Sequence, residues 1–283
     1  MKWEGRGGSG NIEDRRGSGG GMRMGLPLGG GVGGLVLLLV ISALTGTNPL
    51  DLIGGGGPVP SESVGTTGVR DDDPQAKFIS VILGDTEQAW GELFRQRGEA
   101  YVPPTLVLFT GATQSGCGVG QSAMGPFYCP SDQKVYLALS FFQELDQRFG
   151  APGDFAQAYV VAHEVGHHVQ TLLGISSRVG AARQRGDERN ANALSVRQEL
   201  QADCLAGVWG YYAGQHGLLE AGDAEEGLTA AAAIGDDRLQ REAQGRVAPE
   251  SFTHGSSEQR VSWLRRGLQS GKVEACDTFS SGS

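Results

Sequence analysis

The nine residues AHEVGHHVQ, at positions 162–170, contain the pattern His163-Glu164-x-x-His167, whose residue types and spacing are those of a zinc site on a helix. Residues four apart lie one turn above each other, so His163 and His167 could direct their imidazoles at one metal ion. Glu164 lies about 100° further round the helix, where its carboxylate could reach a water molecule without binding the ion. The chemistry that the pattern indicates is metal-assisted hydrolysis.

The same side chains could instead be ordinary polar residues on a helix surface, since short motifs also occur by chance. Three of the chain's five histidines, however, fall within six residues of an otherwise apolar stretch, 155–173, and burying them without partners would be costly. His168 is not expected to be a ligand, because neighbouring residues in a helix diverge. Gly166 is unfavourable inside a helix by roughly 1 kcal/mol, so we expect another segment to pack closely against the backbone there.

A catalytic zinc ion usually has three protein ligands and one position left for water, so a third ligand must come from elsewhere. We expect it to be Glu199, on a second apolar helix predicted over 195–214, because an unpaired carboxylate there would be expensive to bury. Asp203 lies one turn later and could accept a hydrogen bond from the outer nitrogen of a ligand histidine. The alternative is that both are exposed acids. His216, flanked by a Gly-rich loop, is expected to be exposed.

The chain has 283 residues, which allows one or two domains, and a net charge of −9 from 23 Lys and Arg and 32 Asp and Glu. This acidic balance argues against an electrostatic nucleic-acid partner. There are 47 glycines, many of them in the first 70 residues, so the folded part is shorter than the chain.

The first 73 residues divide into three segments that are not expected to join the folded core. Residues 1–23, rich in Gly, Arg and Ser, are predicted to be a disordered cytoplasmic N-terminus. Residues 24–50 carry no charge and are long enough to cross a membrane, and the basic residues before them predict a single-pass anchor with the N-terminus in the cytoplasm. A cleaved signal peptide is the alternative. Residues 51–73 are predicted to be a flexible linker.

Residues 74–279 are predicted to form one α+β, helix-rich domain with a small antiparallel sheet beside the helix of His163. We expect a strand at 105–110 and a hairpin within 116–139 that turns at Pro130. Two sequence pairs have the spacing of a helix capping box. They are Asp223 with Glu226 and Ser256 with Gln259.

Four cysteines are present without a CxxC pair, which argues against a thiolate zinc site or a thioredoxin-like site. In an exported protein an even number predicts two disulfides, and three connectivities are possible. We expect Cys117–Cys129, which would close the predicted hairpin, and Cys204–Cys276, which would tie the C-terminal tail to the helix bearing Glu199.

Several stretches resemble the bacterial neutral zinc metallopeptidases, a family of single-pass membrane proteins with a zincin-type domain. They are GCGVGQSAMGPFYCP, VYLALSFF, GDFAQAYVVAHEVGHHVQ, ELQADCLAGVW, AAAAIGDDRLQ and FTHGSSEQRVSW. The likeness covers nearly everything from about Pro74 to Phe279. HEVGH, ELQAD and THGSSEQR are also similar, in order and roughly in spacing, to gluzincin proteases of the CAAX-processing type. The polytopic helices of those proteases are absent, so their lipidated substrates are not carried over.

The resemblance implies roles for seven side chains, His163, Glu164, His167, Glu199, Asp203, His254 and Arg260. The first Glu of ExxxD would bind zinc, and a later His–Arg pair would serve the active site. Glu164 would take a proton from water as general base, and His254 would stabilise the oxyanion. Without the resemblance, His254 is as well explained as a capping or surface histidine. Arg260 could orient His254, hold substrate or simply lie on the surface.

Together these features predict a zinc metallopeptidase anchored in the bacterial cell membrane, with its catalytic domain outside the cytoplasm and a peptide or protein as substrate. A catalytically idle zinc-stabilised scaffold that binds partners at the cell surface is the alternative, although a structural zinc site would have four protein ligands and no base. A zinc hydrolase that acts on a non-peptide amide is a third hypothesis. An exposed sheet edge within 118–128 could bind the peptide as an added strand, unless that segment is merely a loop held by a disulfide.

Overall fold

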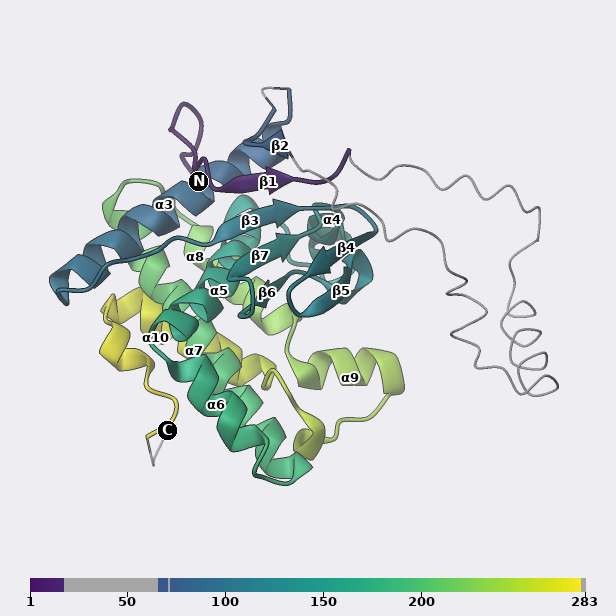
Figure 1. Ribbon diagram of the computed structural model, residues 1–283. Helices are drawn as coiled ribbons and strands as arrows, with labels where there is room; N and C mark the ends of the chain where they lie inside the picture. The colour runs from purple at the N-terminus through teal and green to yellow at the C-terminus, as the bar shows by residue number, and fades with distance from the viewer. Residues whose placement is uncertain (18–65, 71, 281–283) are drawn as a thin grey trace, which may run out of the picture. The chain divides into compact units, whose positions relative to one another are not determined.

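The computed structural model describes residues 1–17, 66–70 and 72–280, and Met1–Arg16 lies in one compact unit with the chain from Gly65 onward (Figure 1). The helices are α3 (Pro74–Gln96), α4 (Ser140–Gln147), α5 (Asp154–Leu172), α6 (Ile175–Arg183), α7 (Glu188–Gln215), α8 (Asp223–Ala233), α9 (Asp236–Gln244) and α10 (Ser257–Ser270). The strands are β1 (Ile12–Asp14), β2 (Thr66–Thr67), β3 (Thr105–Leu108), β4 (Ala112–Ser115), β5 (Gly118–Gln121), β6 (Phe127–Cys129) and β7 (Lys134–Leu137). Short 3-10 turns are η1 (Ser122–Met124), η2 (Pro249–Ser251) and η3 (Val273–Cys276).

A five-stranded sheet in the order β2-β1-β3-β7-β6 lies beside the helices. The pairs β1–β3 and β3–β7 are parallel, whereas β1–β2 and β6–β7 are antiparallel. The helix-rich α+β class is therefore confirmed, but the sheet predicted to be small and antiparallel is a mixed one. A parallel pair needs a crossover connection, and here the β4–β5 hairpin and β6 occupy the connection that returns the chain from β3 to β7.

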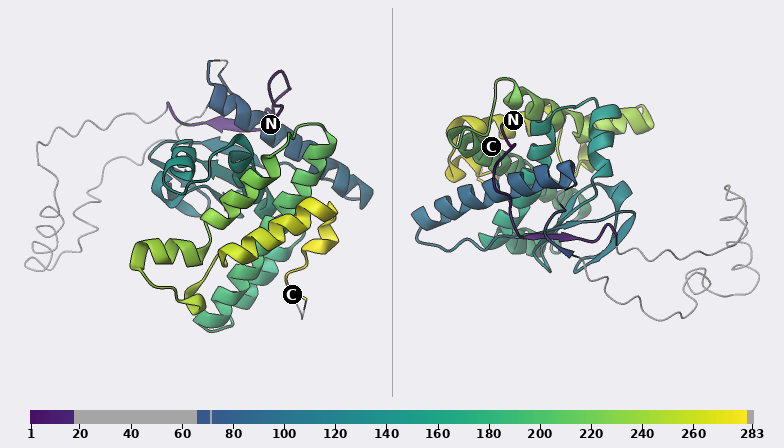
Figure 2. Two further views of the ribbon diagram at one scale, coloured as in Figure 1. Left: turned by 180° about the vertical axis from the view of Figure 1, so that it is seen from behind. Right: turned by 90° about the horizontal axis from the view of Figure 1, so that it is seen from above.

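Helix α5 occupies the centre of the core and carries His163. It packs against α3, α7 and α8, and α10 packs along α7, so that these helices gather on one side of the sheet (Figure 2). A Cβ atom added at Gly166 would lie 3.0 Å from the carbonyl oxygen of Ala202 on α7. The expected close packing at Gly166 is thus confirmed, and it lets α5 and α7 approach backbone to backbone.

The first seventeen residues are ordered, which contradicts the prediction of a disordered segment over 1–23 for that part. Ile12 is buried in the core at 1% exposure, and β1 forms the strand next to β3. The Trp3 ring also packs edge-on against Phe78 of α3, with ring centroids 5.4 Å apart. A short polar strand can enter a sheet when its backbone groups bond on both sides, and composition alone does not reveal this.

The strand pairing also bears on the predicted membrane topology. The predicted anchor, residues 24–50, lies outside the described residues, and no helix in the described part of the chain is long and apolar enough to span a membrane. Asp14 of β1 pairs with Thr66 of β2, so described residues before and after the predicted anchor belong to the same sheet. The predicted single-pass topology stays a prediction, and any attachment through residues 24–50 must keep β1 and β2 in one sheet. The linker predicted over 51–73 is also shortened, because Thr66–Thr67 is a strand.

Both predicted disulfides are present, Cys117–Cys129 and Cys204–Cys276. The predicted turn at Pro130 connects β6 to β7. Cys117–Cys129 ties this hairpin to the tip of the β4–β5 hairpin, since Cys117 lies between those two strands. The second bridge joins α7 to η3 close to the C-terminus.

Of the two predicted capping boxes, one is present and the other is not. Ser256 and Gln259 form a capping box at the start of α10, as predicted. Asp223 does not cap α8, because Gly222 occupies the N-cap position and Asp223 is the first helical residue. Glu226 instead accepts a hydrogen bond from the backbone nitrogen of Phe155 on α5, so a tertiary contact has replaced the local one.

Replacing Cys204 and Cys276 together by Ser is expected to lower the free energy of unfolding by about 4 kcal/mol, because the bridge restricts a long loop of the unfolded chain. The two cysteines are 72 residues apart in sequence. Denaturant unfolding of the oxidised wild type and of the double variant measures the difference. The matched control is the double Ser variant of Cys117 and Cys129, whose separation is only 12 residues and whose effect should be smaller. An equal loss for both pairs would contradict the loop-length argument.

Candidate metal centre

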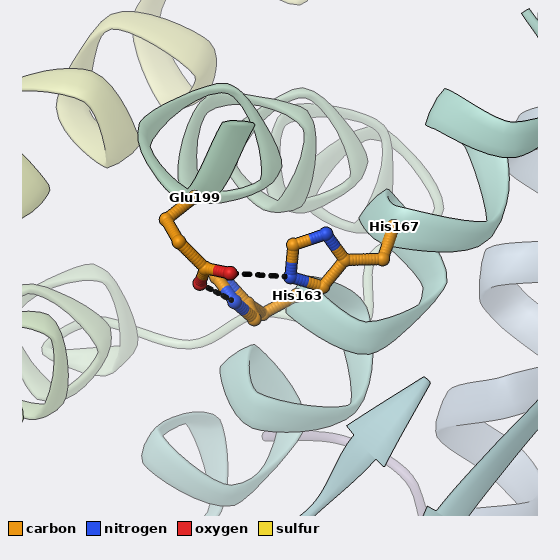
Figure 3. Close-up of side chains that lie close together, drawn as sticks. All are labelled: His163, His167 and Glu199. Carbon is orange, nitrogen blue, oxygen red and sulfur yellow. Dashed lines mark hydrogen bonds and ion pairs between the residues drawn. The ribbon is translucent and has the colours of Figure 1, made fainter. Parts of the chain in front are cut away.

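Helices α5 and α7 bring three candidate ligands together at their crossing. His163 and His167 project from one face of α5, and Glu199 faces them from α7 (Figure 3). One Glu199 carboxylate oxygen, Oε2, lies 3.2 Å from His163 Nε2, and the other, Oε1, lies 3.4 Å from His167 Nε2. The three residues each offer a ligand atom, and all of these atoms lie within 4.8 Å of one another.

These distances can be compared with those that zinc requires. Ligand atoms bound tetrahedrally at about 2.0–2.1 Å from zinc are about 3.3–3.4 Å apart, close to the two nitrogen–oxygen separations above. The donor set is two imidazoles and one carboxylate, which suits zinc and leaves a fourth position without a protein ligand. The predicted third ligand, Glu199, is therefore where a metal ion would require it.

The charges around this point favour a cation. Burial disfavours a protonated imidazole, but Asp203 and Glu199 outweigh it and raise the pKa of His163 to about 10. The pKa of His167 is also raised, since Glu199 outweighs burial, and the imidazoles hold the pKa of Glu199 well below its usual value despite burial. Positive charge is thus stabilised among these side chains, and a divalent cation can supply it while both imidazoles stay neutral.

Asp203 supports His163 from the next turn of α7, as predicted. Its Oδ1 lies 2.9 Å from His163 Nδ1, and it also accepts a hydrogen bond of 2.6 Å from the Tyr159 hydroxyl. Arg260 of α10 donates to both carboxylate oxygens of Asp203, each at 2.9 Å. Burial opposes ionisation, but Arg260 and His163 outweigh it and lower the pKa of Asp203 to about 2. The charged Asp203 therefore orients the His163 ring.

The position of Arg260 departs from two of its three predicted roles, those of a surface residue and of a partner of His254. It is 3% exposed and bonded to Asp203 and Tyr159, so it is neither a surface residue nor hydrogen-bonded to His254. Its guanidinium balances the buried Asp203 carboxylate, which would otherwise be costly to hold in the core. Arg260 thus supports the ligand His163 through Asp203.

Glu164 lies in the same cleft as the candidate ligands but is not one of the three clustered residues. Its side chain is buried, and burial raises the pKa of its carboxyl above the usual value. A carboxylate whose pKa is raised toward neutrality takes up a proton more readily than an exposed one. This position matches the role of a base next to the metal rather than that of a ligand.

His254 lines the cleft from the loop before α10, with about half of its side chain exposed. Its Nδ1 lies 3.2 Å from Asp236 Oδ1. The other oxygen of Asp236 accepts hydrogen bonds from three successive backbone nitrogens, those of Thr253, His254 and Gly255. Asp236 at the start of α9 therefore fixes both the loop and the imidazole.

The cleft has a volume of about 640 Å³. It is lined by Ala123, Met124, Gly125, Pro126, Phe127, Tyr128, Pro130, Phe141, Glu144, Arg148, Phe149, Tyr159, Val160, His163, Glu164, His167, Ser176, Gly180, Arg183, Gln198, Glu199, Ile234, Leu239, His254 and Arg260. The predicted base, ligands and oxyanion donor thus share one accessible space, large enough for several residues of a peptide.

Comparison with known proteins agrees with this geometry. Residues 1–279 match the family described as "Putative neutral zinc metallopeptidase". The chain belongs to this family. It is 53% identical to the uncharacterised protein YpfJ of Escherichia coli over 284 residues, which cover 99% of each chain. It is 43% identical to the uncharacterised protein Rv2575 of Mycobacterium tuberculosis over 215 residues, 72% of each chain. No solved structure matches the chain.

In this neutral zinc metallopeptidase family member, three further residues hold the side chains of the metal centre and of His254, and the sequence alone did not indicate them. Tyr159 lies one turn before His163 and donates to Asp203. The side-chain oxygen of Gln170 lies 2.8 Å from His167 Nδ1, and Asp236 holds His254. Helical spacing from the motif could have indicated Tyr159 and Gln170, whereas the partner of His254 depends on how α9 packs.

The remaining histidines pack within the fold of this family member, His168 fully buried and His216 partly buried. His168 lies off the ligand face, as predicted, between the Tyr128 hydroxyl and the carbonyl oxygen of Val102. His216 was expected to be exposed, but its side chain is 15% exposed and its Nδ1 lies 2.8 Å from Asp85. The packing of α3 against α7 brings that buried carboxylate to the end of α7.

A second acidic group lies away from the cleft, at the start of α5 and of α8. It consists of Asp154, Asp223 and Glu226. The amino group of Met1 lies 2.8 Å from Asp154 and 3.5 Å from Asp223. This ammonium group lies against two of the carboxylates, so the cluster has a cationic partner within the protein.

Proposed function

We propose that this protein is a zinc-dependent peptide hydrolase in which His163, His167 and Glu199 hold one zinc ion. The observation that supports this most is buried Glu164 in the same cleft as a cluster of three candidate ligands, which is all that the described residues place there. A structural zinc site has four protein ligands and needs no base, so this arrangement disfavours the idle scaffold. A cleft long enough for several residues favours a peptide over a small non-peptide amide.

Each side chain in the cleft has one task in the proposed reaction. Zinc, when bound, supplies a Lewis acid that lowers the pKa of water to about 7 and polarises a carbonyl group. Glu164 accepts the proton of the attacking water and passes it to the leaving amine. His254 donates a hydrogen bond to the oxygen on which negative charge develops. Asp203 and Gln170 hold the rings of His163 and His167 in their orientations.

The fold supports a zincin-type assignment, which we include in the proposal. The HExxH helix α5 contacts strand β6, and the third ligand comes from the later helix α7. Within the described residues, β6 is the outer strand on its side of the sheet order. A peptide could therefore add to β6 as a further strand, above the metal centre.

The proposed substrate-binding edge covers a shorter range of residues than the sequence indicated. The prediction covered 118–128, but Gly118–Gln121 is already paired as β5 with β4. Ala123 lies in the 3-10 turn η1 and not in a strand. The proposed edge is Phe127–Cys129 with the cleft-lining residues 123–126 before it.

Membrane attachment stays a proposal that rests on the uncharged sequence of residues 24–50. Two disulfides support a location outside the reducing cytoplasm. Since β1 and β2 are paired, the first seventeen residues and the metal centre must share that compartment. Protease accessibility of a tag after residue 280 and of the N-terminal segment in intact cells tests this: both should be on the outer side.

The hydrolase proposal is tested by measuring zinc content and the cleavage of unfolded casein by the full-length purified protein. We expect one zinc per chain, loss of cleavage with a chelator and recovery when zinc is returned. Glu199→Ala should bind zinc far more weakly while the fold is retained. Absence of stoichiometric zinc, or cleavage that a chelator leaves untouched, would overturn the proposal.

Replacing Asp236 with Asn is expected to move the alkaline limb of the kcat profile to lower pH. The hydrogen bond with Asp236 outweighs burial and raises the pKa of His254, so the imidazole keeps its second proton to a higher pH. Without the carboxylate this pKa falls, and the charged donor is lost earlier as pH rises. Peptide hydrolysis measured from about pH 5 to 9, on both sides of the usual histidine pKa, reveals the shift.

Asp237→Asn is the control for this prediction. The Asp237 carboxylate accepts hydrogen bonds from the backbone nitrogen and the hydroxyl of Ser257. The substitution therefore removes a neighbouring charge without changing a contact of the His254 ring. In this variant the alkaline limb of the kcat profile should stay near its wild-type pH. Identical profiles for wild type and Asp236→Asn would exclude charged His254 as the oxyanion donor.

A further inference from the structure

The walls of the cleft differ in chemical character on the two sides of the metal centre, and this difference defines a substrate class. Resting on the proposed hydrolase function, we propose that the protein selects an extended polypeptide with a bulky apolar side chain on one side of the scissile bond and an acidic side chain on the other. The apolar subsite is formed by α4, α9 and the first half of α5, and the basic subsite by α6.

The apolar wall consists of five side chains from separate elements that meet in the cleft, Phe141, Phe149, Val160, Ile234 and Leu239. Arg238 Nη2 donates to the carbonyl oxygen of Phe149 at 3.0 Å, which ties α9 to the end of α4 and brings Leu239 toward Phe149. Three of the five, Phe141, Ile234 and Leu239, are only partly buried, so apolar surface remains for a ligand to cover.

The charged groups at the apolar wall are already paired with each other. Arg148 lies 3.7 Å from Glu144, one turn away on α4, and its guanidinium lies over the Phe149 ring. These two charges largely cancel, and the wall therefore favours an uncharged side chain of the substrate.

The α6 wall is polar and basic. Ser176, Gly180 and Arg183 line the cleft at the i, i+4 and i+7 positions, so they lie on one helix face. A Cβ atom at Gly180 would meet nothing within 4 Å, which leaves room for a peptide beside the helix. Arg183 is exposed and, among the described residues, has no ion pair. Its charge is thus available to an acidic group in the cleft.

The two walls lie toward opposite ends of α5. Val160 precedes the ligand His163 by one turn, whereas Ser176 follows the helix and its hydroxyl lies 3.1 Å from that of Thr171. The span from Val160 to Thr171 is about 16 Å at 1.5 Å per residue, with the HExxH residues between. An extended peptide advances about 3.3 Å per residue, so a segment of several residues can touch both walls while its scissile bond lies at the centre.

The net charge of the whole chain does not indicate a basic subsite. Its net charge is −9, but the segment from α6 to the start of α7 contains Arg178, Arg183, Arg185 and Arg189 against Asp187 and Glu188. The local excess of positive charge in an acidic protein is the charge complementarity on which this proposal depends. It also identifies the partner as anionic at that position.

The test uses two sets of peptides on the full-length zinc-loaded protein. One set carries Leu or Ala at each of three positions on one side of a fixed cleavable bond. The other set carries Asp or Lys at each position on the opposite side. Both sets are also made with the two sides of the bond exchanged. We expect Leu to exceed Ala by roughly tenfold in kcat/KM at one position. Asp should exceed Lys by about twofold to fivefold on the opposite side, an effect that fades with salt.

Two substitutions with matched controls assign these preferences to the walls. Arg183→Glu should reverse the preference for Asp over Lys, whereas Arg178→Glu, on the same helix but outside the cleft, should not. Leu239→Ala should reduce the preference for Leu over Ala about threefold or more, whereas Leu228→Ala, a partly buried leucine of α8 outside the cleft, should not. Equal effects of a variant and its control would overturn the assignment, because net charge or general destabilisation would explain both.

Binding separates this inference from the hydrolase proposal. The Glu164→Gln variant should bind the same peptides intact, and fluorescence anisotropy gives their dissociation constants. The same order of peptides in binding supports the subsites even if the wild type cleaves none of them, in which case only the hydrolase proposal fails. Cleavage or binding without any preference between Leu and Ala, or between Asp and Lys, would overturn the inference while the hydrolase proposal stands.

Discussion

Replacing Glu164 with Gln is expected to reduce peptide hydrolysis by a factor of roughly 10²–10⁴, the usual contribution of general-base catalysis, because an amide cannot accept the proton, while the protein still binds one zinc ion. The Glu164 side chain is buried in the cleft and is not among the three clustered ligand residues. The amide has nearly the same shape as the carboxylate, so packing should not change. Turnover of a fluorogenic peptide and zinc content of the same sample measure the two expectations.

The raised pKa of Glu164 adds a second expectation to this variant. Burial raises that pKa, so replacement by Gln removes a carboxyl group whose charged form burial disfavours. The thermal midpoint should therefore be equal to or above that of the wild type. Loss of zinc from the variant would instead indicate that Glu164 is a ligand, and turnover near the wild-type rate would exclude it as the base.

Replacing Asp203 with Ala is expected to weaken zinc binding by roughly 10–100-fold and to lower the free energy of unfolding by about 3–5 kcal/mol. The carboxylate is fully buried and holds His163, Tyr159 and two nitrogens of Arg260, Nε and Nη2. Its removal leaves the guanidinium without its counter-charge and frees the imidazole to rotate. Competition with a metal chelator and denaturant unfolding measure the two losses.

Tyr159→Phe is the matched control, because it removes one hydroxyl from the same network and leaves the ion pair intact. It should lower the unfolding free energy by about 1 kcal/mol and change zinc affinity little. If Asp203→Ala binds zinc as tightly as the wild type does, Asp203 stabilises the fold without orienting His163. The two measurements therefore separate the role of Asp203 at the metal from its role in packing.

The proposed reaction depends on a rigid frame that two disulfides and a close helix crossing provide. Gly166 allows the α5 backbone to approach Ala202, and Cys204 anchors the same turn of α7 to the C-terminal segment. Ligands carried on packed helices hold their separation better than ligands on loops. His254 differs, since it lies on a loop that Asp236 holds through three backbone hydrogen bonds.

The sequence by itself determined the parts of this protein that depend on local spacing. His163 and His167 share a helix face because residues four apart always do, and the same rule places Asp203 one turn from Glu199. The capping box at Ser256 and the turn after Cys129 follow from contacts between near neighbours. Glu199 could be selected because a carboxylate on an apolar helix requires a partner.

Only the tertiary structure decided which distant residues complete the site. Asp236 could not be matched to His254, nor Arg260 to Asp203, because the two residues of each pair lie on different elements of the fold and their contact depends on how those elements pack. The strand at Ile12–Asp14 was missed for the same reason, since its parallel partner is β3, about ninety residues later. Glycine-rich polar composition predicts disorder when no partner is visible. Backbone hydrogen bonds to a distant strand order such a segment, and its own residues carry no periodic signal of that pairing.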